Sequence, residues 1–154
     1  MRTSVAIPVS VLVCFAVGLT ASYFQNESLA LWYPILNRSV YSPPNIVFPI
    51  VWSILYLLMG ISVGLVIGSK HPQRGRVVAI FIVQLVLNFL WSILFFNQRN
   101  PLLGLIDIVL LDMAVLLYMV CSYKVNRASM YLFLPYIVWL VIATYLNGYI
   151  FMNN

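Results

Sequence analysis

Five long apolar stretches dominate the sequence and limit what it can fold into. An α-helix needs about 20 mostly apolar residues to cross the hydrocarbon core of a bilayer, and stretches of this length run over 5–24, 46–68, 77–96, 102–123 and 128–151. The composition agrees, because 64% of the residues are hydrophobic and only 7% are charged, too few to cover a surface that faces water. The sequence therefore predicts an all-α protein, a five-transmembrane-helix bundle in which residues 1–154 form a single membrane domain.

The basic residues are distributed unevenly over the predicted connections. With five spans, the N-terminus and the second and fourth connections share one side of the membrane, and this side collects Arg2, Lys70, Arg74, Arg76, Lys124 and Arg127. The other side receives only Arg38 and Arg99. By the positive-inside rule we expect a multi-pass protein of the cell inner (plasma) membrane, with the N-terminus cytoplasmic and the C-terminus outside. The net charge of +5 is then a signal of topology, and it indicates lipid rather than nucleic acid as a partner.

The longest connection, residues 25–44, lies on the outer side by this count. Long connections often act as lids or binding loops. Within it Leu29, Trp32, Tyr33 and Leu36 recur at helical spacing until Pro34 interrupts the hydrogen-bond ladder. This spacing predicts a short amphipathic turn over the mouth of the bundle, and an aromatic anchor at the membrane interface is the alternative.

Prolines mark the start of the second span. Pro43 and Pro44 favour an extended approach to the helix, with Pro44 able to open it. Pro49 has no N–H to give to the carbonyl of Asn45, which predicts a kink or a delayed helix start and an unpaired acceptor. Irregular backbone at this depth is tolerated where it lines a cavity or is buried in protein. The prolines therefore predict a stiff rim that aims Trp52 inward.

Three glycines, Gly60, Gly64 and Gly68, form a repeated G-x-x-x-G on one face of the second span. Small residues at this spacing let two helix backbones approach closely in a membrane. The pattern predicts a packing face, and its partner is either another helix of the same chain or a second subunit.

Polar and aromatic side chains form stripes on four of the predicted helices. At helical spacing they are Pro49, Trp52 and Tyr56; Gln84, Asn88, Trp91 and Phe95; Asp107, Ala114 and Tyr118; and Tyr136, Trp139, Ala143 and Asn147. Aromatic walls with a few amides are typical of a pocket for a large, flat, mostly apolar ligand. Amides also join transmembrane helices and aromatic residues form interfacial belts, so ordinary packing is the alternative for any one stripe. Trp52, Asn88 and Trp139 together favour the pocket. Each lies in the outer half of its span or near the middle, beneath the long connection.

The sequence has few residues suited to conventional acid–base or metal-assisted catalysis. The single histidine, His71, lies in a predicted cytoplasmic loop. Asp107 and Asp112 point about 140° apart on an α-helix, so they cannot act as a pair, and one of them is expected to bond a neighbouring helix. Cys14 and Cys121 lie in apolar segments without the spacing of a metal site, and no metal is expected.

Several motifs resemble the TspO family of translocator proteins, also called the peripheral-type benzodiazepine receptor (TspO/MBR) family, and point to a bacterial member. They are the pair Trp32–Tyr33, SPPNIVFPIVWSILYLLMG from Ser42 to Gly60, QLVLNFLWSILFF from Gln84 to Phe96, Asp107 in LGLID, and LPYIVWLVIATYLN from Leu134 to Asn147. The resemblance implies five transmembrane helices, frequent homodimers and a pocket under the first loop. Its ligands would be porphyrins, haem and synthetic benzodiazepine or isoquinoline carboxamide compounds.

Carried over by this resemblance, Trp52, Asn88, Trp139 and Ala143 would line the pocket, and Trp32, Tyr33, Pro43 and Pro44 would form its lid and rim. The stripes add Tyr56, Trp91 and Asp107 to the candidate ligand-binding residues. We expect a membrane receptor that binds a porphyrin such as protoporphyrin IX and requires no resident cofactor. Light-dependent porphyrin breakdown is a further hypothesis, in which Trp52 and Trp139 act as photochemical catalytic residues because the excited porphyrin is itself the reactive species. A transporter of tetrapyrroles or other small hydrophobic molecules and a purely structural scaffold are the alternatives.

Overall fold

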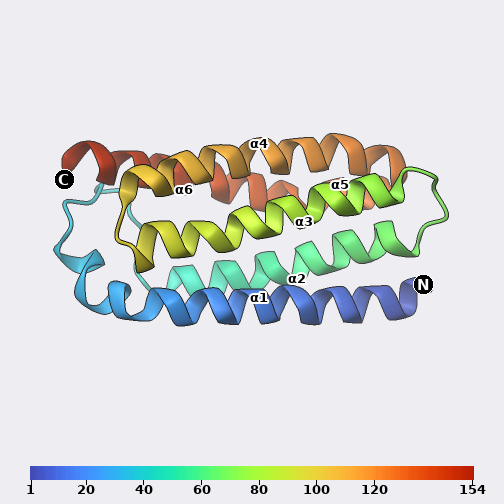
Figure 1. Ribbon diagram of the computed structural model, residues 1–154, viewed down its shortest axis with the longest axis horizontal. Helices are drawn as coiled ribbons and strands as arrows, with labels where there is room; N and C mark the ends of the chain where they lie inside the picture. Colours follow the sequence, from blue (N-terminus) through green and yellow to red (C-terminus); the bar gives the residue numbers. More distant parts are fainter.

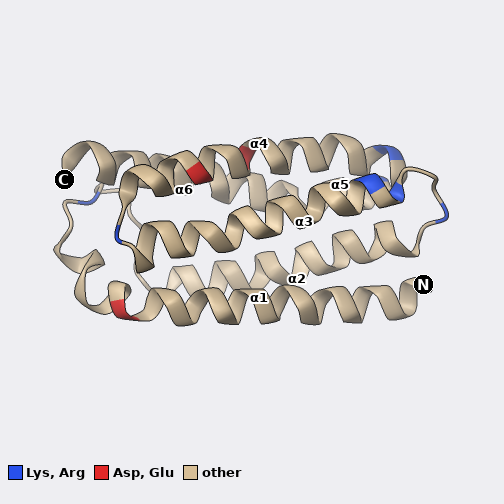
Figure 2. Cartoon of the chain, in the orientation of Figure 1, with Lys and Arg blue, Asp and Glu red and all other residues tan.

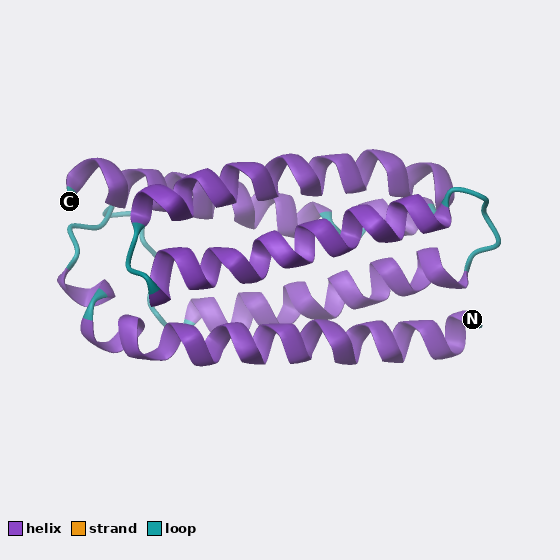
Figure 3. Ribbon diagram, viewed as in Figure 1, coloured by secondary structure: helices purple, strands orange, loops and turns teal.

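The computed structural model describes residues 1–154 as a long bundle of antiparallel helices with the two termini at opposite ends (Figure 1). The helices are α1 (Thr3–Leu31), α2 (Val47–Gly68), α3 (Arg74–Trp91), α4 (Pro101–Val125), α5 (Arg127–Tyr131) and α6 (Leu134–Asn153), with a 3₁₀ turn η1 (Tyr33–Ile35) and a π-helical segment η2 (Ser92–Asn97). They make five apolar helical segments long enough to cross a membrane: Thr3–Leu31, Val47–Gly68, Arg74–Asn97, Pro101–Val125 and Arg127–Asn153. Helix fills the bundle and loops lie mainly at its two ends (Figure 3). The prediction of an all-α, five-span membrane protein is confirmed.

The first helix is longer than the sequence pattern predicted. α1 continues to Leu31, so the first part of the predicted 25–44 loop is helical and Leu29 belongs to α1. Residues 25–31 contain neither proline nor glycine, and Pro34 is the first residue after them that opposes a helix. The connection that covers this end of the bundle, here called the lid, is therefore residues 32–46.

Two of the spans contain local breaks. In the last span α5 and α6 are separated at Leu132 and Phe133, because Pro135 has no N–H and its ring would clash with the carbonyl of Tyr131. In the third span the wider turns of η2 follow α3, with the N–H of Gln98 bonded to the carbonyl of Ile93 at 2.8 Å. Such π-helical insertions occur frequently at functional sites.

The glycine ridge of α2 packs against α1 of the same chain. A Cβ atom at Gly64 would lie 2.7 Å from the Cα atom of Ile7, and one at Gly60 would lie 2.5 Å from the Cα atom of Val11. Real Cβ atoms do not come this close to backbone, so only glycine allows α1 and α2 to approach as they do. The choice left open by the sequence is thus resolved in favour of an intramolecular contact.

The half of the bundle nearest the N-terminus has a closely packed interior. The rings of Tyr118 and Phe133 lie 4.3 Å apart, centroid to centroid, and neither side chain is exposed. The Ser62 hydroxyl lies 2.8 Å from the Tyr118 hydroxyl and donates to the Ser129 carbonyl, and the Ser129 hydroxyl donates to the Ser62 carbonyl. These bonds join α2, α4 and α5, and they satisfy polar groups that would otherwise be costly in a membrane.

Charged residues gather mainly at the ends of the bundle (Figure 2). The loop between α2 and α3 and the junction of α4 with α5 bring most of the basic residues to the end that holds the N-terminus. The lid end carries Arg38, Arg99 and Glu27, while Asp107 and Asp112 lie within α4. This separation of charge, with apolar helices between the ends, defines a multi-pass membrane protein.

Candidate functional site

A cavity of about 210 Å³ lies in the lid half of the bundle, between α1, α2 and the α3–η2 segment. Its lining residues are Gly18, Ala21, Ser22, Gln25, Asn26, Leu29, Asn45, Phe48, Pro49, Trp52, Tyr56, Asn88 and Ser92. Ser22, Asn26 and Asn45 are exposed, so this larger compartment reaches the surface between α1 and α2 through a mouth with polar side chains.

A smaller compartment of about 30 Å³ adjoins the first and shares four of its wall residues. It is lined by Gln25, Leu29, Phe48, Trp52, Trp91, Phe96, Trp139 and Ala143. Five of these eight side chains are aromatic, which makes this compartment the most aromatic part of the site. The two compartments together are here called the lid cavity.

One hydrogen-bonded chain of buried side chains organises the floor of the lid cavity. Tyr56 donates its hydroxyl to Oδ1 of Asn88 at 2.8 Å, Asn88 donates Nδ2 to the Tyr136 hydroxyl at 2.7 Å, and Tyr136 donates to Oε1 of Gln84 at 3.0 Å. The chain joins α2, α3 and α6, and it uses both the oxygen and the nitrogen of the Asn88 amide. Asn88 thus holds the aromatic walls in place, and a buried network that satisfies its members in this way specifies a single arrangement.

The two tryptophans of the predicted site occupy different walls. Trp52 lies against the ring of Tyr56, with the centroids 5.6 Å apart and the planes 32° apart, and its side chain faces both compartments. Trp139 meets Phe48 edge-on at 5.7 Å. The indole Nε1 of Trp139 is buried and has no hydrogen-bond partner, a costly condition that a ligand acceptor would relieve.

Trp91 forms the third aromatic wall and is fixed on both sides. Its ring stacks on Phe95 at 5.0 Å with an interplanar angle of 13°. Its Nε1 donates to Oδ1 of Asn147 at 3.0 Å, and Asn147 donates Nδ2 to the carbonyl of Pro101 at 2.8 Å. The residues of the fifth span thus hold the end of the third span and the start of the fourth.

The inner surface of the lid is aromatic. Tyr33, in η1, is buried and packs edge-on against Phe48 and at a tilt against Phe96, with centroids 6.3 and 5.9 Å away. The guanidinium of Arg38 lies 4.6 Å from the centroid of the Tyr33 ring, a cation–π distance. Tyr33 therefore covers the lid cavity on its lid side by packing behind Phe48 and Phe96, although Tyr33 itself is not a lining residue.

Hydrogen bonds tie the lid to α6. The backbone N–H of Asn37 donates to Oδ1 of Asn154, and Nδ2 of Asn154 donates to the Asn37 carbonyl, at 2.8 and 3.0 Å. The hydroxyls of Ser39 and Tyr145 lie 3.0 Å apart and share a third bond. Opening the lid would break all three.

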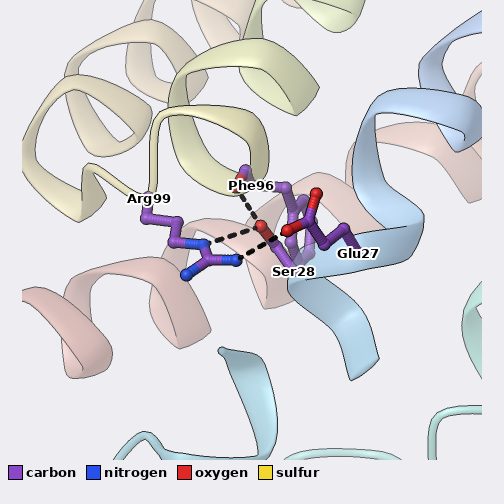
Figure 4. Close-up of polar contacts among 4 residues, drawn as sticks. All are labelled: Glu27, Ser28, Phe96 and Arg99. Atoms are coloured by element: carbon purple, nitrogen blue, oxygen red, sulfur yellow. Dashed lines mark hydrogen bonds and ion pairs between the residues drawn. The ribbon is translucent and has the colours of Figure 1, made fainter. Parts of the chain in front are cut away.

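A polar cluster beside the lid cavity joins α1 to the loop that follows η2 (Figure 4). Ser28 donates its hydroxyl to the Phe96 carbonyl at 2.5 Å and accepts from Nε of Arg99 at 3.2 Å. Arg99 has a positive φ of 52°, and its Nη2 lies 3.8 Å from Oε1 of Glu27. Because Glu27 is well exposed, that ion pair contributes little, and the buried Ser28 bonds hold the helix end.

The structure brings six of the predicted ligand-binding residues together around the lid cavity: Trp52, Tyr56, Asn88, Trp91, Trp139 and Ala143. Trp32 lies against Phe95 outside the lining, and Pro43 and Pro44 line a separate open basin on the outer side of the lid. Asp107 is buried in α4 away from this lining, with Oδ2 unpaired, whereas Asp112 accepts a bond from Thr144 on α6 at 2.7 Å. The expectation that one aspartate bonds a neighbouring helix is confirmed.

The prediction of an unpaired carbonyl at Asn45 is wrong. The N–H of Phe48 donates to it at 3.3 Å, because the first turn of α2 tightens to bonds between residues three apart. α2 begins at Val47, one residue after the predicted start, and Pro49 lies in its first turn.

Sequence reasoning missed Gln25, Leu29, Phe48 and Ser92 as wall residues. Gln25 faces both compartments and donates Nε2 to the Ser92 hydroxyl at 2.6 Å. Gln25 and Leu29 lie in the part of α1 that the sequence pattern predicts as a loop. The uninterrupted helical run to Leu31 is the signal that could have placed these two on the cavity wall.

Fold and cavity together define a polytopic five-helix membrane protein with an aromatic cavity beneath a lid. Residues 10–152 match the model of the TspO/MBR family, and the chain belongs to that family. It is 42% identical to the tryptophan-rich protein TspO of Archaeoglobus fulgidus, over 94% of each chain. It is also 33% identical to protein CrtK of Rhodobacter capsulatus, over 92% of this chain and 88% of the relative, and 31% identical to the human translocator protein, over 86% and 79%.

Proposed function

We propose that this protein is a membrane receptor that binds flat, mostly apolar ligands of the tetrapyrrole class, such as protoporphyrin IX, in the lid cavity. The observation that carries the proposal is the convergence of Phe48, Trp52, Trp91, Phe96 and Trp139 on one compartment. Aromatic faces stack on flat conjugated ligands, while a few polar groups orient them. Gln25 and the unpaired Nε1 of Trp139 are the groups available for orientation. Synthetic benzodiazepine or isoquinoline-type compounds share this chemistry.

The lid cavity is smaller than a typical ligand site. Sites for drug-sized ligands typically enclose about 300–1,000 Å³, whereas the two compartments hold about 210 and 30 Å³. Because these volumes lie below that range, we expect wall residues to move when a porphyrin binds.

Photochemistry is a second activity that this site would support. An excited porphyrin in contact with Trp52 or Trp139 would accept one electron from the indole, which leaves an indole radical cation and a porphyrin radical anion. Dissolved dioxygen would be the oxidant that then converts the reduced porphyrin irreversibly. The ligand supplies the reactive excited state, and the protein positions the electron donor.

Transport is the alternative function, and the relatives include a protein named translocator protein. The packed interior around Tyr118 and Phe133 favours a receptor, because a passage across the membrane would have to run through it. We further propose the plasma membrane as the location, with the N-terminus cytoplasmic. A homodimer would use a face other than the glycine ridge, which α1 covers.

The test is a titration of the detergent-solubilised protein with protoporphyrin IX, in the dark and then under illumination, followed by tryptophan fluorescence and porphyrin absorbance. We expect saturable quenching in the dark and loss of porphyrin absorbance in light. The double variant Trp52→Phe, Trp139→Phe is expected to bind but to lose most of the light-dependent step.

Trp32→Phe is the matched control, because Trp32 lies outside the cavity lining. Absence of saturation in the wild-type protein would remove the receptor proposal. Equal porphyrin loss in the double variant would remove the photochemical one.

A further inference from the structure

An apolar groove of about 250 Å³ runs along the membrane-facing surface between α2 and α6. It is lined by Val51, Ile54, Leu55, Pro135, Val138, Trp139 and Ile142. These residues lie in the first half of α2 and near the middle of the last span, at a depth where the hydrocarbon core surrounds the bundle. The groove is therefore open to lipid chains and not to water.

Trp139 is a wall of this groove and also a wall of the small compartment of the lid cavity. It is the one residue that lines both spaces, while Leu55 lines the groove and Phe48 lines the compartment. α2 and α6 are not among the closely packed helix pairs of the bundle, so their backbones give this side chain little support from behind. Displacing the indole would join the groove to the cavity.

The hydrogen bonds of the structure make Trp139 the easier barrier to move. Its Nε1 has no partner, so rotation of the side chain breaks no hydrogen bond. Opening the lid breaks the two bonds of Asn37 with Asn154 and the bond of Ser39 with Tyr145. Joining the groove to the lid cavity would also add about 250 Å³ to the 210 and 30 Å³ of the two compartments, which brings the combined volume within the range of about 300–1,000 Å³ typical of ligand sites.

The other surface openings fit an apolar ligand less well. A larger groove of about 500 Å³ lies between α1 and α3, but none of its lining residues lines the lid cavity. The mouth between α1 and α2 has polar side chains, Ser22, Asn26 and Asn45, and leads to the larger compartment only. An apolar ligand dissolved in the bilayer meets no polar group in the α2–α6 groove.

We propose that the α2–α6 groove is a membrane-facing mouth of the lid cavity, that Trp139 is its gate, and that apolar, flat ligands enter through it from the bilayer. This inference rests on the proposed function, since it concerns the route to the same site. The gate is closed in the structure, and the ligand opens it by turning the indole out of its contact with Phe48.

The test narrows the groove without touching the cavity. Val138→Phe adds a ring within the groove, and Val138 lines neither compartment. Proteoliposomes are mixed with protoporphyrin IX in a stopped-flow instrument; porphyrin fluorescence reports partition into the membrane, and tryptophan quenching reports binding. We expect association and dissociation both to slow by about tenfold, because an obstructed route hinders both directions.

Two further variants complete the experiment. Val120→Phe on α4 is the matched control, since Val120 is 62% exposed and Val138 is 60% exposed, and it is expected to leave both rates unchanged. Tyr145→Phe removes the bond to Ser39 and loosens the lid. It is expected to leave both rates unchanged, because the proposed route does not pass through the lid. Rates that are unchanged by Val138→Phe, or faster dissociation with normal association, would overturn the inference while the receptor proposal stands; a wild-type protein without saturable binding would overturn both.

Discussion

At the scale of single residues, the lid cavity depends on amide and hydroxyl groups that the ligand does not need to touch. Asn88 lies in the wall of the lid cavity, and its amide holds Tyr56 and Tyr136. Without these hydrogen bonds, the aromatic side chains of the cavity walls could adopt many arrangements. The hydrogen-bonded chain selects one of them, and Trp52 packs at a tilt against Tyr56, which belongs to the chain.

Tyr136→Phe tests this chain. The change leaves Nδ2 of Asn88 and Oε1 of Gln84 without partners, so we expect the free energy of unfolding to fall by about 1–2 kcal/mol. Thermal unfolding in detergent can be followed with a thiol-reactive dye, because Cys14 is buried in the folded protein. Tyr131→Phe, at an exposed position whose hydroxyl makes no hydrogen bond within the chain, is the control, and equal melting temperatures for the two variants would contradict the role given to the chain.

At the scale of helices, the glycine ridge sets the distance between α1 and α2. These two helices form the wall through which the larger compartment reaches the surface. The sequence identified the ridge but could not assign its partner, because close packing on a second subunit would leave the same G-x-x-x-G pattern. The partner follows only from the three-dimensional positions of Ile7 and Val11.

Gly64→Ala tests the ridge. The new methyl group would overlap the backbone of Ile7, so α1 must shift, and we expect a loss of about 1–3 kcal/mol in stability. Gly148→Ala is the matched control, because a Cβ there meets only Leu105 at an ordinary 3.8 Å. A Gly64→Ala protein that melts like the wild type but loses its oligomeric state would instead assign the ridge to a subunit interface.

The extent of the helices shows what sequence patterns could predict and where they fell short. The five spans follow from hydropathy alone, since each crosses the membrane independently of its neighbours. The helical state of Gln25 and Leu29 did not follow, because polar residues such as Asn26 and Glu27 ended the apolar run without ending the helix. The cavity wall on α1 was therefore missed, while the tryptophans of the other helices were found from their spacing.

At the scale of the whole molecule, the two ends of the bundle differ in charge and in packing. Most of the basic residues lie at the N-terminal end, where the interior is filled, and the lid cavity opens toward the other half (Figure 2). In the orientation that we propose from the positive-inside rule, the filled end would face the cytoplasm. The ligand site would then lie in the outer half of the membrane.

Reporter fusions test this orientation. Alkaline phosphatase folds only outside the cytoplasm, so a fusion after Asn154 is expected to be active, and a fluorescent protein that matures only in the cytoplasm is expected to fail there. The same two reporters joined before Met1 should give the opposite result. Activity of the phosphatase at the N-terminus would reverse the proposed topology.

The affinity of Ala143→Leu for protoporphyrin IX tests whether the lid cavity holds the ligand. Ala143 is buried in the wall of the small compartment, and a leucine there would fill a space of about 30 Å³. We predict that binding weakens by at least about tenfold, or roughly 1.4 kcal/mol, while Ala79→Leu, at an exposed position on α3, binds as the wild type does. Equal affinity of all three proteins would show that the ligand is held elsewhere and would contradict the account.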